Sequence, residues 1–294
     1  MERSKLYMLL GDLAVLLVAF IWGATNVVIR DALTGITPFW FCALRFIIGW
    51  ATVMLLFGRR AVAMPRRTKL TGVAIGAVFI CAYLVGAVAL LYTTAGNQSF
   101  IISMSVVFVP LSVWFMTKKF PGWHVAASVV LCTAGMAGLM LDGSMSVNVG
   151  DALCFVSMLF VTAYILLVQR YVGEADPCGL ACWQALGGMV LAVAFAFAFE
   201  PIPTNLAADA WIAIVYSATI GFALTLVLQT VAQKYTSATH VAILLSTSGV
   251  FGSILGVVFI GEPMTFRIFT ASALILAGVL MVEAYPALRK KRTD

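Results

Sequence analysis

The sequence predicts an all-α integral membrane protein with ten transmembrane helices arranged as two inverted five-helix repeats. Three observations predict this fold: the composition, the number of apolar runs and an internal duplication. Hydrophobic residues make up 63% and charged residues 10% of the 294 residues, and the mean hydropathy is +1.06. Soluble domains contain roughly 45–50% apolar and 25% charged residues. Because the loops between the apolar runs are short, almost the whole chain is expected to lie in the bilayer.

Apolar runs of the length that crosses a bilayer, about 20 residues, recur along the whole chain. The predicted spans are residues 9–29, 38–57, 70–92, 97–117, 123–141, 150–169, 178–199, 210–232, 239–260 and 266–286. The first five spans form a repeat over residues 1–146, and the last five form a repeat over residues 147–294. Arg3 and Lys5 precede the first span as they would in a signal peptide, but the matching segment in the second repeat indicates that this span belongs to the fold.

The duplication is clearest in a stretch that begins at Tyr92 in the first repeat and at Tyr235 in the second. The two copies align without a gap, and their identical pairs include Thr93/Thr236, Ala95/Ala238, Ser103/Ser246, Ser105/Ser248, Val107/Val250 and Phe108/Phe251. Upstream, Gly11-Asp12 matches Gly150-Asp151 in a register shifted by four residues. Because each repeat has five spans, the second copy must cross the membrane in the opposite direction, as is common in secondary transporters.

The basic residues indicate the orientation. With a cytoplasmic N-terminus, the inner segments hold Arg3, Lys5, Arg59, Arg60, Arg66, Arg67, Lys69, Lys118, Lys119, Arg170, Lys234 and the basic tail at 289–292. The outer segments hold Arg30 and Arg267. By the positive-inside rule, we expect a multi-pass plasma-membrane protein with both termini in the cytoplasm. The basic residues behind the net charge of +6 therefore set the orientation in the membrane and do not indicate a nucleic-acid partner. Membrane lipid is expected to surround the protein.

Small residues at helical spacing predict close packing of helices. Gly72 and Gly76, and likewise Gly252 and Gly256, form small-xxx-small patterns that let helix backbones approach each other. Packing within one chain is the first interpretation, and dimerisation through these faces is the alternative. The oligomeric state is therefore left open between monomer and homodimer.

Several short motifs, in their order along the chain, resemble the drug/metabolite transporter superfamily, in particular its EamA-type ten-span permeases. They are Trp22-Gly23-Ala24-Thr25-Asn26, then Ala43-Leu44-Arg45-Phe46 after Pro38, Tyr235-Thr236-Ser237-Ala238, Gly261-Glu262-Pro263-Met264-Thr265 and Ala277-Gly278. The first half departs from the family's paired turn because Lys119 stands where the second half has Glu262. The resemblance implies a central cavity lined by spans one, three, four, six, eight and nine. It also implies transport of small polar or amphipathic metabolites, often outward.

Candidate solute contacts lie near the middle of the spans. They are Trp22, Thr25, Asn26, Arg45, Tyr83, Ser99, Ser103, Tyr164, Phe222 and Ser246, with Thr225 beside them. Apart from Arg45, they describe a pocket of rings, an amide and hydroxyls without fixed charge, which suits a neutral, zwitterionic or aromatic solute. Each hydroxyl has an alternative role as a packing group bonded to its own helix backbone. We expect Trp22, Asn26, Tyr164 and Ser246 to converge on one cavity.

Arg45 is the one basic residue well inside a predicted span. An ionisable residue at membrane depth is a functional candidate, and a guanidinium can hold a carboxylate or phosphate by two hydrogen bonds. The alternative is structural: Arg45 snorkels outward or caps helix carbonyls. Its repeat partner is Gln184, so a symmetric pair of charges is excluded.

The predicted function is secondary transport of small organic metabolites such as amino acids, amines or nucleosides, by alternating access, as an exporter or facilitator. The sequence has no Gly-x-x-x-x-Gly-Lys-[Ser/Thr] phosphate loop and no catalytic or metal-ligand constellation, so we predict neither an enzyme nor a cofactor. Asp12 and Glu283 lie within about a turn of inner span ends, so transport is not expected to depend on an intramembrane carboxylate. The alternatives are a channel, a non-transporting membrane protein or an intramembrane enzyme, which would need clustered titratable groups at one membrane face.

Overall fold

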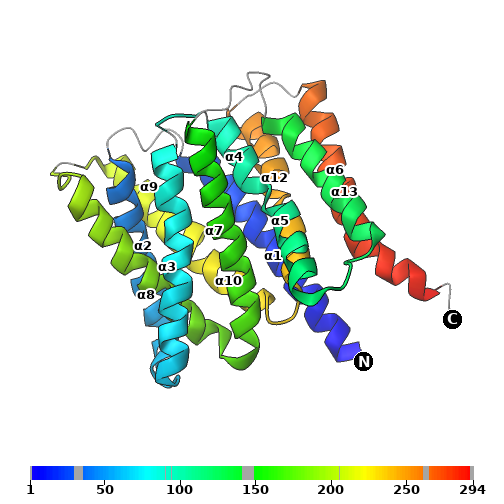
Figure 1. The fold of residues 1–294 in the computed structure, drawn as a ribbon. Helices are drawn as coiled ribbons and strands as arrows, with labels where there is room; N and C mark the ends of the chain where they lie inside the picture. The colour runs from blue at the N-terminus through cyan, green and yellow to red at the C-terminus, as the bar shows by residue number, and fades with distance from the viewer. Residues whose placement is uncertain are drawn as a thin grey trace.

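The computed structural model describes residues 2–29, 36–89, 91–93, 95–140, 149–204, 206–260 and 265–291, and the secondary structure over these residues is helical (Figure 1). The first half contains α1 (Glu2–Ile29), α2 (Pro38–Val62), α3 (Arg66–Ala89), α4 (Ala95–Ser103), α5 (Ser105–Thr117) and α6 (Trp123–Met140). The second half contains α7 (Val149–Tyr171), η1 (Val172–Glu174), α8 (Pro177–Phe199), α9 (Ala208–Ala218), η2 (Thr219–Leu224), α10 (Thr225–Ala232), α11 (Ala238–Leu245), α12 (Ser248–Leu255), η3 (Gly256–Ile260) and α13 (Phe266–Lys291).

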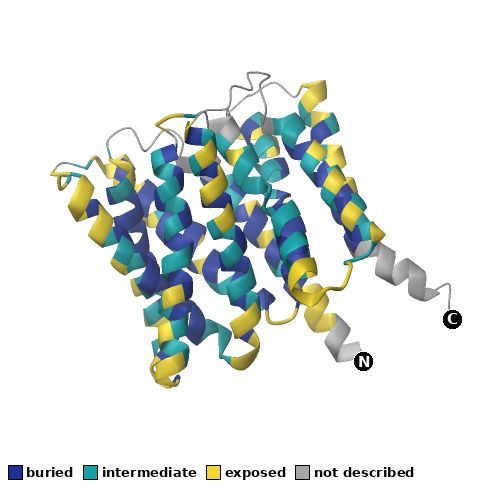
Figure 2. Ribbon diagram, in the orientation of Figure 1, coloured by how far each residue is buried: buried dark blue, intermediate teal, exposed yellow. Residues whose placement is uncertain are grey.

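Length and apolar composition mark eight segments of the described chain as able to cross a membrane. Two further apolar helices, Trp123–Leu139 and Phe266–Val282, are shorter and correspond to predicted spans five and ten. Large apolar side chains such as Leu55 and Phe259 are exposed, and exposed residues occur along the helices of the bundle as well as at their ends (Figure 2). The structure therefore confirms an all-helical, multi-span membrane architecture, while the count of ten spans stays a prediction.

Both copies of the duplicated stretch are interrupted at equivalent positions. α4 gives way to α5 at Met104, and α11 gives way to α12 at Ser246 and Thr247. At each break the backbone tightens: the N–H of Met104 donates to Ile101 O at 3.1 Å, and that of Thr247 donates to Leu244 O at 3.1 Å. Such a tightened turn inside a helix often marks a functional hinge. The two breaks divide predicted spans four and nine near their middles.

Two pairs of helices run antiparallel across the two halves. Glu200, at the end of α8, accepts hydrogen bonds from the backbone N–H groups of Phe39 (3.1 Å) and Trp40 (2.9 Å) in the first turn of α2. At the opposite end of the pair, the indole of Trp183 in α8 donates to Ala61 O in α2 at 3.0 Å. A carboxylate stabilises a helix N-terminus by satisfying its free N–H groups and its positive dipole. α6 and α13 form the second pair, which lies at one edge of the molecule (Figure 1).

Helices α1 and α7 each pack on helices of the other half. α1 contacts α10, α11 and α12, and α7 contacts α3, α4 and α5. The equivalent residues Asp12 and Asp151 make equivalent bonds there: the Thr236 hydroxyl donates to Asp12, and the Thr93 hydroxyl donates to Asp151. Each bond joins one of these helices to the turn before the interrupted helix of the other half.

Helix α3 approaches α8 closely through glycines. A Cβ added at Gly76 would overlap the carbonyl oxygen of Gln184, and one added at Gly187 would overlap that of Val73. Gly72 also faces α8, against Leu180 and Trp183. The small-xxx-small pattern of α3 is thus used for packing within the chain.

Replacing Gly76 by alanine is expected to lower the free energy of unfolding by about 3 kcal/mol, because α3 and α8 would have to separate to admit the Cβ. A reversible denaturation curve in detergent micelles measures this loss. Gly173→Ala is the matched control, because nothing lies within 4 Å of a Cβ at that position, and it should unfold like the parent protein. A Gly76→Ala protein as stable as the Gly173→Ala control would contradict the observed α3–α8 contact.

Candidate functional site

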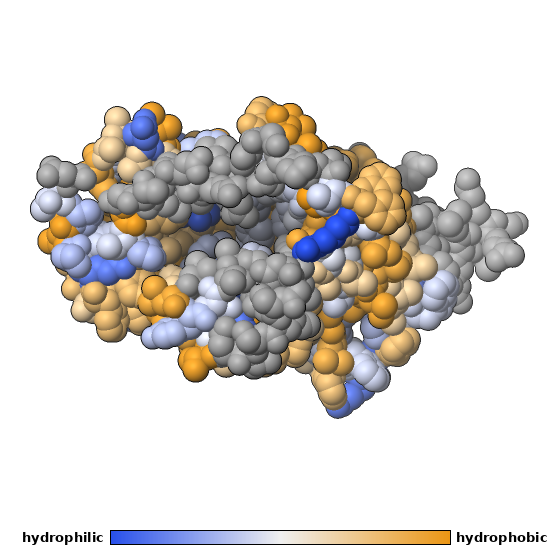
Figure 3. All heavy atoms as spheres, turned by 90° about the horizontal axis from the view of Figure 1, so that it is seen from above, coloured by the Kyte–Doolittle hydropathy of each residue, from blue (hydrophilic) through white to orange (hydrophobic). Residues whose placement is uncertain are grey.

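A cavity of about 540 Å³ lies among the helices and is lined by residues of both sequence repeats. Its lining reaches Pro38 at the start of α2 and Ala87 near the end of α3, so it approaches the end of the bundle opposite the N-terminus (Figure 1). Seen from that end, the molecular surface is hollowed near its centre (Figure 3). Small-molecule sites typically measure about 300–1,000 Å³, so the cavity has room for one small organic solute.

One wall of the cavity is aromatic. The ring of Phe79 lies 4.4 Å from that of Tyr164 and 5.1 Å from that of Tyr83, centroid to centroid. All three rings line the cavity, and Phe46 and Phe222 pack behind them at 4.2 Å from each other. Phe79 and Tyr83 stand one helical turn apart on α3, so they present one face. Rings in this arrangement form a rigid apolar surface that a flat or apolar solute can contact.

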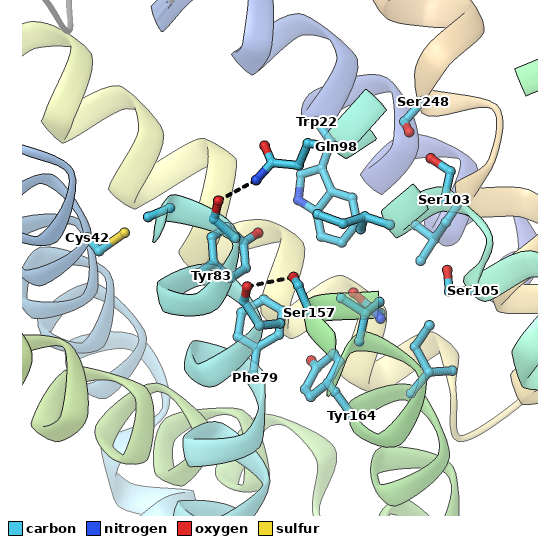
Figure 4. A pocket seen from close by; sticks show the side chains of 18 of the residues that line it. Trp22, Cys42, Phe79, Tyr83, Gln98, Ser103, Ser105, Ser157, Tyr164 and Ser248 are labelled. Atoms are coloured by element: carbon cyan, nitrogen blue, oxygen red, sulfur yellow. Dashed lines mark hydrogen bonds between the residues drawn. The ribbon is translucent and has the colours of Figure 1, made fainter. Parts of the chain in front are cut away.

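The opposite wall is rich in hydroxyls and is built at the two helix breaks. Ser103 and Ser105 flank the break in the first repeat, and Ser246 and Ser248 flank the break in the second; all four line the cavity. Figure 4 shows Ser103, Ser105 and Ser248 across the cavity from Phe79 and Tyr83. Interrupted helices near mid-membrane are a common source of polar groups in transporter sites.

Two further polar side chains are fixed by the backbone of α3. The Gln98 amide donates to Gly86 O, and the Ser157 hydroxyl donates to Ala82 O at 2.7 Å (Figure 4). Both residues line the cavity. The bond of Ser157 uses its one donor, so its hydroxyl oxygen keeps acceptor capacity for a solute. The Gln98 amide keeps its oxygen as an acceptor and one further N–H as a donor.

Toward the end that carries the N-terminus, glutamine amides connect α7 to the end of α10. Gln233 donates from its amide to Ile165 O at 2.9 Å, and Gln169 donates to Gln233 O at 3.1 Å. Ile165 itself lines the cavity, so these bonds tie α7 to the end of α10 directly below it. On this side of the cavity, side-chain bonds to backbone carbonyls therefore join α7 to the end of α10.

Arg45 of α2 also lines the cavity and is 8% exposed. Its Nη2 donates to Gly221 O at 3.2 Å, and its Nε is buried without a hydrogen-bond partner. The guanidinium carbon lies 5.7 Å from the ring centroid of Tyr83 and 6.0 Å from that of Phe222. Arg45 thus points inward among aromatic rings and does not snorkel to the lipid surface.

The structure brings together a large part of the predicted site. Trp22, Arg45, Tyr83, Ser103, Tyr164 and Ser246 all line the cavity. Trp22, Tyr164 and Ser246 therefore converge as expected, whereas the side chain of Asn26, like Glu262 and the side chain of Glu283, lies outside the described residues. The indole of Trp22 donates across the two halves to Thr225 at 3.2 Å, which fixes the indole's position.

Three other predicted residues do not line the cavity. Thr25 is buried and donates to Ile21 O of its own helix at 2.7 Å, which is the packing role left open by the sequence. Phe222 is buried behind the aromatic wall, where it meets Gly49 and Phe46. Ser99 is exposed.

Sequence reasoning missed several lining residues. Span two contributes Phe41 and Cys42 as well as Arg45, although the family resemblance implied no lining role for this span. Gln98 and Gln229 also line the cavity. An amide side chain inside an apolar span is unusual, and this feature of the sequence could have identified both residues. Phe79 could have been predicted less clearly, because its spacing of one helical turn from Tyr83 places it on the same face of α3 as that candidate residue.

The EamA-like transporter family model matches the chain twice, at residues 9–141 and 148–284. The chain belongs to this family. The two consecutive matches agree with the duplication read from the sequence, and the EamA-type resemblance is thereby confirmed. The protein is thus an integral membrane protein of a transporter family.

Relatives of this EamA-family protein cover nearly its whole length. An uncharacterized transporter of Archaeoglobus fulgidus is 30% identical over 275 residues, which are 94% of this chain and 86% of the relative. Uncharacterized transporter YwfM of Bacillus subtilis (strain 168) is 26% identical over 303 residues, which span 96% of each chain. A solved crystal structure matches with a TM-score of 0.81 at 17% identity and covers 97% of this chain and 98% of its own, which supports the fold alone.

Proposed function

We propose that this EamA-family protein is a secondary transporter of small organic solutes that works by alternating access, with the cavity as its solute site. The observation that carries the proposal is the cavity itself. Both repeats build it, and each contributes an interrupted helix whose break presents hydroxyls to the cavity. A channel needs a continuous path, whereas on the N-terminal side of this cavity the bonds of Gln233 and Gln169 join α7 to α10.

We further propose that the two halves are inverted repeats. The antiparallel α2–α8 pair, the equivalent helix breaks and the equivalent Asp–Thr bonds support a two-fold relation between oppositely directed halves. Under this relation each half can adopt the conformation of the other. Exchanging the two conformations would close the cavity at one membrane face and open it at the other.

The packing suggests which helices move together. α7 contacts α3, α4 and α5, while α1 contacts α10, α11 and α12. We propose that these two groups are the rigid bodies of transport, each held by one Asp–Thr bond. The moving units then differ from the sequence repeats, because α1 and α7 are exchanged between them.

The orientation is proposed from the charges. Arg59, Arg60, Arg66, Arg67 and Lys69 flank the turn between α2 and α3, which lies at the same end of the molecule as the N-terminus (Figure 1). By the positive-inside rule, that end faces the cytoplasm of a plasma-membrane protein. In this orientation the cavity approaches the outer face, as expected of an outward-facing state.

Counterflow in proteoliposomes tests the proposal. Purified protein is reconstituted, and uptake of labelled amino acids, amines, nucleosides and organic acids is measured with and without the unlabelled solute inside. A carrier should give saturable uptake that preloading accelerates, because the loaded site returns faster than an empty one. Uptake that rises linearly with concentration and ignores preloading would indicate a channel. Protein-free liposomes are the control, and no flux of any solute class would contradict transport.

A further inference from the structure

Arg45 is the only charged side chain among the described residues that line the cavity. It is buried, and neither described ion pair with printed partners, Arg60–Asp176 or His240–Asp12, involves it. A buried cation without a counter-ion is strongly disfavoured, since its lost hydration is not replaced. Among the described residues, therefore, no carboxylate pairs with the positive charge beside the cavity.

The hydrogen bonds of Arg45 leave most of its donors unused. A guanidinium carries five N–H donors, and the protein accepts from Nη2 alone, at Gly221 O. That carbonyl already accepts the Thr225 hydroxyl at 2.8 Å, so Arg45 is not needed to satisfy it. A purely structural role as a carbonyl cap accounts for little of the guanidinium's bonding capacity.

The repeat partner of Arg45 provides no second charge. Gln184 is 1% exposed and accepts a hydrogen bond from the Tyr164 hydroxyl at 3.3 Å. It does not line the cavity. Arg45 is therefore the one charge among the described lining residues, while Trp22, Phe79 and Tyr164 provide apolar surface in the same lining. A solute that matches this pattern has one anionic end and an apolar body.

We propose that Arg45 binds the carboxylate of the transported solute, and that the solute class is an organic monocarboxylate with an aromatic or apolar body. This inference rests on the proposed transport function. A guanidinium holds a carboxylate by paired, charge-assisted hydrogen bonds. A single arginine suits one negative charge better than a phosphate or dicarboxylate. Because no acidic side chain is present among the described lining residues, an ammonium group on the solute is not required.

Four solutes that share a phenyl ring and differ in polar group test the proposal on the purified, full-length protein. They are 3-phenylpropionate, its uncharged amide, L-phenylalanine and 2-phenylethylamine. Affinity is measured by calorimetry and by the shift in melting temperature. The two carboxylates should bind roughly 10- to 100-fold more tightly than the amide and the amine, the range of one charge-assisted bond pair. Equal or tighter binding of the amine or the amide, or no binding by any of the four at millimolar concentration, would overturn the proposal.

Substitutions assign the effect to Arg45. Arg45→Gln places the residue of the second repeat at this position and should reduce carboxylate affinity to that of the amide, while Arg45→Lys should retain part of the preference. Arg60→Gln is the matched control, because Arg60 is exposed and lies outside the lining, and it should bind like the parent. Carboxylate affinity unchanged in Arg45→Gln would also overturn the proposal. If Arg45→Gln does not fold, Arg45→Lys and the solute series on the parent protein still test whether Arg45 binds the carboxylate.

Counterflow separates this inference from the proposed function. Accelerated exchange of an amine or nucleoside, with carboxylates inactive, would overturn the carboxylate assignment and leave transport standing. Arg45-dependent binding of 3-phenylpropionate without any exchange would overturn transport and leave the carboxylate site standing.

Discussion

Replacing Phe79 by alanine is expected to lower the free energy of unfolding by about 3–5 kcal/mol, the usual range for removing a buried phenylalanine side chain. Phe79 is 6% exposed, and its ring contacts those of Tyr164, Tyr83 and Phe46. The substitution enlarges the cavity and removes the centre of its aromatic wall. Denaturation in detergent micelles measures the stability, and the affinity for a transported solute should fall in parallel.

Two further variants isolate the cause. Phe79→Leu fills most of the volume and should recover much of the stability, while the affinity for aromatic solutes stays reduced because the stacking surface is lost. Phe259→Ala is the matched control, since Phe259 is 75% exposed and is not one of the described residues that form the hydrophobic core or pack against it. If Phe79→Ala were as stable as Phe259→Ala, the aromatic wall would not support the surrounding helices.

The duplication predicted more of the site than the hydropathy did. Hydropathy locates spans, but it does not say which face of a span meets a cavity. The repeat register pairs Ser103 with Ser246, and both line the cavity. It also pairs Thr25 with Tyr164, but only Tyr164 lines the cavity, so the register predicts the helix breaks better than it predicts the contacts of α1 and α7.

Other features depend on contacts that no local pattern contains. Arg45 is directed inward by a carbonyl 176 residues away in sequence, at Gly221, and by rings from two other helices. The composition of span two alone could not distinguish a snorkelling Arg45 from a substrate-binding one. Phe222 looked like a cavity residue by depth, but Gly49 leaves a gap in α2 that its ring fills.

The helix breaks at Met104 and Thr247 also escaped prediction. Neither is a proline or glycine, and Pro110 lies six residues beyond the first break. In the second copy the hydroxyls of Ser246 and Thr247 donate to Ile243 O and Leu244 O, which helps to stabilise the tightened turn. Met104 has no hydroxyl, so the break in the first copy lacks the equivalent of the Thr247 bond.

Replacing Asp12 by alanine is expected to lower the free energy of unfolding by about 1–3 kcal/mol, because it leaves the buried hydroxyl of Thr236 without its acceptor. Asp12 and Thr236 are 3% and 5% exposed, and their bond fixes α1 to the turn between α10 and α11. His240 lies 4.0 Å from the same carboxylate oxygen. Asp12→Asn keeps an acceptor and should retain both stability and transport, as expected if no intramembrane carboxylate carries protons. Loss of transport in a stable Asp12→Asn protein would show that the charge itself is required.

A double-mutant cycle extends the test to the repeat. If the bond accounts for the loss, Asp12→Ala combined with Thr236→Ala should be little worse than Asp12→Ala alone. The same cycle on Asp151 and Thr93 should give a coupling of the same sign, because that bond is its repeat equivalent, and a smaller size, because Asp151 is less buried. Coupling at Asp12 but none at Asp151 would mean that α7 is not held to α3 and α4 as α1 is held to α10 and α11. The two proposed rigid bodies would then not be equivalent, and a symmetric exchange of conformations between them would lose its structural basis.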